Sequence, residues 1–97
     1  MARAEQSQPK IRARYLSAGL VAAGRVLAIN PNHAQGLAMQ GALQLVRAQD
    51  ELDPSARTST ARLAARSLAE ALIGDPFLTH SYSPLLITAN ALVQQGL

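Results

Sequence analysis

The sequence predicts an all-α fold of about four helices. A polar residue precedes a proline at Asn30-Pro31, Asp53-Pro54 and Asp75-Pro76, and the residue before a proline is pushed out of the α region, so each pair marks a helix boundary. Between these breaks, apolar residues recur every three or four positions, as they do on a helix face. Alanine dominates the apolar residues and only three residues are aromatic. The core is therefore expected to gain stability from close approach of helices.

The first predicted helix covers residues 9–29. It begins at Ser7-Gln8-Pro9, where a capping hydroxyl precedes a proline suited to the first turn. One apolar stripe along it consists of Ile11, Tyr15, Ala18, Ala22, Val26 and Ile29. A second consists of Leu16, Leu20, Ala23 and Leu27. So wide an apolar arc predicts contacts on two sides. Gly19 and Gly24 are expected to meet another backbone closely, which would offset their cost of about 1 kcal/mol each relative to alanine.

A long helical hairpin is predicted for residues 32–50 and 54–73. The first of these helices carries small residues along its leading face, which indicates a buried helix lying between two others. Its leading face consists of Ala34, Leu37, Ala38, Gly41, Ala42, Leu45 and Ala48. In the polar loop that follows, Asp53 is the expected N-cap and Pro54 the first helical residue.

The C-terminal part is predicted to contain a short helical turn at 77–82 and a last helix at 84–95. Ser83-Pro84 repeats the combination of cap and proline, and Pro84 is expected to prevent one continuous helix. Residues 1–97 form a single domain in this interpretation, and we expect it to be a fragment of a larger protein.

Several classes of function are disfavoured by what the sequence lacks. Without cysteine there is no disulfide framework or cysteine-based zinc site, and a reducing, cytoplasmic location is expected. No apolar run reaches the roughly 18 residues that span a bilayer, so no membrane partner is expected. His33 and His80 lie in separate turns without a carboxylate at helical spacing. Neither a nucleophile elbow nor a glycine-rich phosphate loop is recognisable, so we expect no enzyme activity, cofactor or metal ion.

Residues 34–76 resemble a tetratricopeptide repeat. Gly41 stands at the family's glycine position, and the second helix offers the family's alanine, large apolar, alanine and proline series. That series consists of Ala64, Leu68, Ala71 and Pro76. The family's aromatic, leucine and tyrosine positions do not match. Gly41 and Ala64 are 23 positions apart, about 11 more than in the family, which is close to three helical turns. The resemblance implies antiparallel helical hairpins stacked as a right-handed superhelix.

A second resemblance concerns the wider context of the chain. The run Ala28-Ile29-Asn30-Pro31-Asn32-His33, the long hairpin and Pro84-Leu85-Leu86 resemble repeat regions at the C-termini of bacterial serine/threonine kinases. This resemblance implies a non-catalytic segment of such a kinase. None of the kinase's own glycine-rich loop, catalytic-loop or metal-binding motifs is present.

The predicted function is protein–protein interaction or scaffolding. In stacked helical hairpins the first helices line the concave surface, where partner peptides dock. The residues expected to contact a protein or peptide partner are Gln40, Gln44 and Arg47, with Asn90 from the next helix of this type.

Two alternatives remain open at this point. The first is self-association as a homodimer, because no preceding helix in this chain covers one stripe of the first helix. The stripe expected to be exposed consists of Leu16, Leu20 and Leu27. The second is nucleic-acid binding through the basic residues, which the lack of interleaved aromatic residues disfavours.

Overall fold

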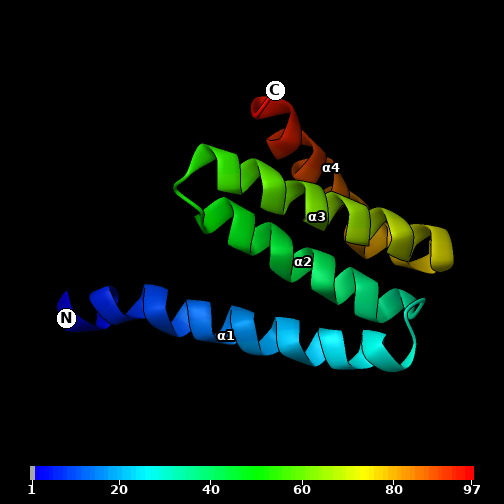
Figure 1. The fold of residues 1–97 in the computed structure, drawn as a ribbon, viewed down its shortest axis with the longest axis horizontal. Coiled ribbons are helices and arrows are strands. Elements are labelled where there is room, and N and C mark those ends of the chain that lie inside the picture. The colour runs from blue at the N-terminus through cyan, green and yellow to red at the C-terminus, as the bar shows by residue number, and fades with distance from the viewer. Residues whose placement is uncertain (1) are drawn as a thin grey trace.

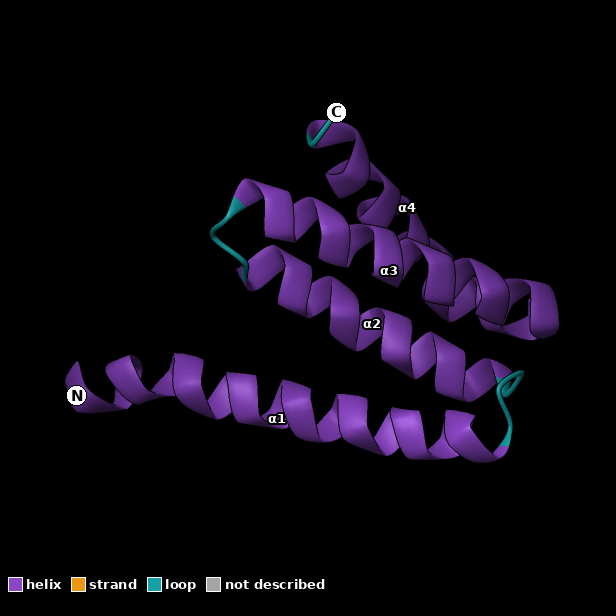
Figure 2. Cartoon of the chain, viewed as in Figure 1, coloured by secondary structure: helices purple, strands orange, loops and turns teal. Residues whose placement is uncertain are grey.

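The computed structural model describes residues 2–97, with side chains described from Lys10 onward. The helices are α1 (Ala2–Ile29), α2 (Ala34–Asp50), α3 (Pro54–Gly74) and α4 (Thr79–Gln95), with a short 3-10 helix, η1 (Pro76–Leu78), before α4. Consecutive helices run in alternating directions (Figure 1). Figure 2 shows that the links between them are short and that the described part of the chain contains no strand. The predicted all-α fold of about four helices is confirmed.

Helix α1 begins earlier than the sequence predicted. It starts at Ala2, so Pro9 lies inside the helix and not at its first turn. The residues before Pro9 are mostly alanine, arginine, glutamate and glutamine, which have high helix propensity, and these favour helix on the N-terminal side of the proline.

The hairpin of α2 and α3 begins each helix with a side-chain cap. The backbone N–H of Gly36 donates to Nδ1 of His33 at 2.9 Å, so α2 begins at Ala34 and not at residue 32. The backbone N–H of Ala56 donates to a carboxylate oxygen of Asp53 at 3.2 Å, and Pro54 follows as the first residue of α3. Each cap satisfies a backbone donor that the first helical turn leaves free.

The core lies between α2, α3 and α4 and consists mainly of alanine. Leu45, Ala64, Leu68 and Ala89 form its largest buried cluster. Gly41 shows how closely α2 and α3 approach each other: a Cβ atom there would lie 2.6 Å from Cγ of Leu68 and 3.1 Å from the backbone oxygen of Ala64. Because Gly41 and Ala64 are small, the backbones of α2 and α3 can lie close together at this point.

The predicted break at Pro84 is wrong. Helix α4 runs without interruption from Thr79 to Gln95, and the separate segments predicted at 77–82 and 84–95 are replaced by η1 and one continuous helix. Proline removes one backbone hydrogen bond to the carbonyl four residues earlier, which belongs to His80. Because His80 and Pro84 are exposed, water can bond to that carbonyl, and the helix continues.

Helix α1 packs mainly on α2 and diverges from it toward its own N-terminus (Figure 1). Among the described residues, no helix combines the length and the apolar character needed to cross a membrane.

Candidate functional site

The structure reverses the expectation about which stripe of α1 is exposed. Leu16, Leu20 and Leu27 are half-buried and Ala23 is only 1% exposed, because the turn after α1 folds α2 back onto this side. Leu27 packs against the buried cluster that joins α2 to α3. The expectation that these leucines form an exposed self-association stripe is therefore wrong.

The other stripe of α1 faces solvent. Four of its large side chains are exposed, from Val26 at 39% and Ile11 at 47% to Tyr15 at 75% and Ile29 at 89%. Ala18 and Ala22 between them are also exposed. We call this surface the open stripe, and it consists of Ile11, Tyr15, Ala18, Ala22, Val26 and Ile29.

The two glycines of α1 help to explain which side of the helix packs against α2. A Cβ atom at Gly19 would lie 2.7 Å from Cδ1 of Leu43, so Gly19 lies where α1 meets α2, as expected. Gly24 has nothing within 4 Å of its Cβ position, and the expectation of a close backbone there is wrong. The small residues Gly19 and Ala23 were the available signal for the packed side of α1.

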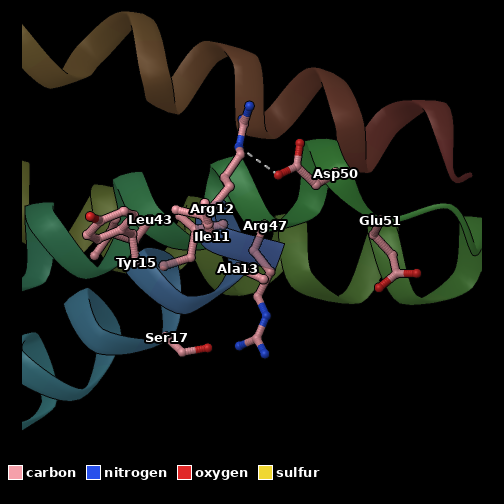
Figure 3. Close-up of a pocket in the computed structure, with 10 residues that line it drawn as sticks. Ile11, Arg12, Ala13, Tyr15, Ser17, Leu43, Arg47, Asp50 and Glu51 are labelled. Carbon is pink, nitrogen blue, oxygen red and sulfur yellow. Dashed lines mark ion pairs between the residues drawn. The ribbon is translucent and has the colours of Figure 1, made fainter. Parts of the chain in front are cut away.

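A groove of about 930 Å³ lies where α1 and α2 diverge. Figure 3 shows the side chains that line it. We call it the α1–α2 groove, and it is lined by Ile11, Arg12, Ala13, Tyr15, Leu16, Ser17, Leu43, Arg47, Asp50 and Glu51. Its lining combines apolar side chains from both helices with charged side chains near the C-terminus of α2.

One ion pair connects the two walls of the groove. Nε of Arg12 on α1 lies 2.9 Å from a carboxylate oxygen of Asp50 on α2, and the two side chains are 56% and 44% exposed (Figure 3). A pair this exposed contributes about 0–1 kcal/mol to stability because solvent screens it. Its main effect is to place opposite charges beside the apolar part of the groove.

The four residues predicted to contact a partner are not brought together. Oγ of Ser67 donates to Oε1 of Gln44 at 3.0 Å and lies 3.4 Å from Oε1 of Gln40, so both half-buried amides are bound to α3. Arg47 is exposed and lines the α1–α2 groove. Asn90 is exposed on α4. Sequence reasoning missed Ser67, although a serine on the apolar side of α3 needs a hydrogen-bond partner when buried.

The charged residues of α1 from Lys10 to its C-terminus are all basic. Residues 10–29 contain Lys10, Arg12, Arg14 and Arg25 and no acidic residue. Of these, Arg12 forms the described ion pair with Asp50. Lys10, Arg14 and Arg25 are exposed, and no ion pair involves them among the described side chains. At about 100° per residue, Arg14 and Arg25 lie directly beside the open stripe.

Among the described side chains, no three of His, Cys, Asp or Glu gather as a possible metal-ligand set. Comparison of the chain with protein-family models, curated proteins and solved structures finds no match. Function is therefore inferred from the chain's own surfaces. The α1–α2 groove and the open stripe are contiguous, because Ile11 and Tyr15 belong to both.

Proposed function

We propose that this chain is a non-catalytic protein-interaction module, built from helical hairpins of tetratricopeptide type, that binds a partner segment in the α1–α2 groove. The groove itself is the observation that carries the proposal. It has a volume of about 930 Å³ and is lined by side chains of both α1 and α2. Its lining combines apolar and charged side chains, and both kinds occur in protein interfaces.

The packing below the groove supports a role as a rigid surface. The side chain of Leu43 packs against Gly19, and Leu45 of the same helix belongs to the buried cluster between α2 and α3. A partner that enters the groove therefore meets an α2 wall that is already held in place by packing, which lowers the ordering cost of binding.

The repeat resemblance also supports the proposal. Gly41, Ala64 and Leu68 carry that resemblance in the sequence, and these three residues are in close contact between α2 and α3. Under this assignment α2 is a first-type helix of a repeat, and Arg47, one of the four residues predicted to contact a partner, lines the α1–α2 groove.

Selection of peptides from a random display library tests the proposed function. We expect peptides of micromolar affinity that lose about tenfold or more when Tyr15→Ser or Arg47→Glu changes the groove. Both side chains are exposed, so folding should be retained. Arg62→Glu, a charge reversal on the exposed side of α3, is the matched control and should leave binding unchanged. Failure to select any peptide, or equal loss in the control, would refute the groove as a binding site.

A further inference from the structure

We infer that the open stripe of α1 is the docking surface for an acidic amphipathic helix of a partner protein. The helix would lie along α1 from the α1–α2 groove to Ile29. This inference rests on the proposed function and specifies the surface used and the chemistry of the partner.

The spacing of the open stripe favours a helix as the occupant. Positions 11, 15, 18, 22, 25 and 29 follow the alternating spacing of four and three residues that forms a helix–helix seam, and all of them except Arg25 are apolar. The stripe is about 27 Å long at 1.5 Å per residue, so a partner helix of roughly 18–20 residues would cover it. Ala18 and Ala22 at the centre allow two helix axes to approach closely, while Ile11, Tyr15 and Ile29 supply larger contacts toward the ends.

The positive charge beside the open stripe determines the sign of the charge that a partner must carry. Arg25 occupies the seam position between Ala22 and Ile29, and Arg14 lies one helical turn from both Ile11 and Ala18. A helix that covers the stripe would remove water from Arg25, and a desolvated charge without a partner is costly. A carboxylate on the incoming helix near Arg25, with a second near Arg14, would satisfy both guanidinium groups.

A second copy of this chain is a poorer occupant of the stripe. If two α1 helices paired over residues 10–29, neither would supply a carboxylate, because the acidic residue of α1, Glu5, lies outside this segment. Arg25 would be desolvated without a counter-charge in any register within that segment. An anionic membrane would supply charge, but Ala18 and Ala22 add little apolar area to a helix lying in a lipid surface.

Three synthetic helices of about 20 residues test the inference with the full chain. All share one leucine seam; the flanking positions carry glutamate in the first, glutamine in the second and lysine in the third. Fluorescence anisotropy of the labelled peptides should show micromolar binding of the glutamate helix and at least about tenfold weaker binding of the glutamine helix. Raising the salt concentration should weaken the glutamate helix most.

Charge-reversal variants of the two arginines beside the open stripe test the same inference from the side of this chain. Arg25→Glu should weaken the glutamate helix by about tenfold or more and strengthen the lysine helix. Arg14→Glu should act in the same direction, which provides a second variant, and Arg62→Glu should change neither. Circular dichroism of each variant establishes that it remains helical.

Four other outcomes of these experiments would each overturn the inference. Equal binding of the glutamate and glutamine helices would remove the charge argument, and no binding of either would remove the stripe as a docking site. Binding to phosphatidylcholine vesicles containing phosphatidylserine, lost in Arg25→Glu, would replace the protein partner by a membrane. A dimer in sedimentation equilibrium that Ile29→Glu disperses would replace it by a second copy. The proposed function is judged separately, by display-selected peptides and the Arg47→Glu variant.

Discussion

Replacement of Gly41 by alanine probes the closest approach in the structure. The added Cβ atom would lie 2.6 Å from Cγ of Leu68 and 3.1 Å from the backbone oxygen of Ala64. Leu68 and Ala64 are both fully buried. The first contact is with the branch point of a buried side chain and the second is with backbone. Neither atom can move aside without displacing α3, so the substitution should force the two helices apart.

The expected loss follows from two opposing effects. Overpacking of a well-packed core costs about 1–3 kcal/mol, whereas replacing a helical glycine by alanine gains about 1 kcal/mol in propensity. Gly41→Ala should therefore lower the free energy of unfolding by up to about 2 kcal/mol. For a chain of this length, that corresponds to a decrease in Tm of up to about 16 °C. Urea unfolding followed by far-UV circular dichroism measures the change directly.

Gly24→Ala is the matched control because its Cβ position has no neighbour within 4 Å. Only the propensity gain remains there, so stability should rise by about 0.5–1 kcal/mol. Gly19→Ala should fall between the two, since the Cβ atom would meet Cδ1 at the flexible end of Leu43 at 2.7 Å. A Gly41→Ala protein as stable as the Gly24→Ala protein would refute the inferred packing of α2 on α3.

Three further substitutions test single contacts by the same urea measurement. Asp53→Ala removes the N-cap of α3 and should cost about 1 kcal/mol, while Asp53→Asn should retain most of that stability; equal losses would show that the cap contributes nothing. Ser67→Ala removes the buried hydroxyl that donates to Gln44 and should cost about 0.5–1.5 kcal/mol. An unchanged urea concentration at the midpoint of unfolding would contradict this prediction. Pro84→Ala restores a backbone N–H inside α4 and should add roughly 1–3 kcal/mol, and a decrease would mean that the proline stabilises the start of α4.

Local sequence signals predicted the start of α3 but failed at Pro9 and Pro84, which both lie inside helices. Asp53 followed by Pro54 predicted the start of α3, and the side-chain cap is present. The start of α2 was placed two residues early because His33, which was interpreted only as a turn residue, is the N-cap. Histidine is an uncommon N-cap, so residue type alone did not reveal that its ring accepts a hydrogen bond from Gly36.

The candidate site was less predictable because it depends on contacts between helices. Periodicity showed that α1 has two apolar stripes. Because both stripes have a helical spacing and a similar size, periodicity did not show which of them α2 would cover. Gln40 and Gln44 were expected at a free edge, and they instead accept hydrogen bonds or lie close to Ser67, which is far away in sequence. Arg47 remained available because it lies farther along α2, where α1 diverges from it.

By itself, the sequence determined the all-α class, the turns between helices and the alanine-rich character of the core. These depend on backbone restriction at proline, on caps and on apolar spacing, all of which act within a few residues. The tertiary structure decided that Leu16, Leu20 and Leu27 face α2 and that Ile11, Tyr15 and Ile29 face solvent. Burial energy depends on which surface of a helix its neighbour covers, and this is a property of the tertiary structure. Here Leu43 of α2 fits closely against Gly19 of α1, so α2 covers the side of α1 that carries Gly19 and leaves the open stripe uncovered.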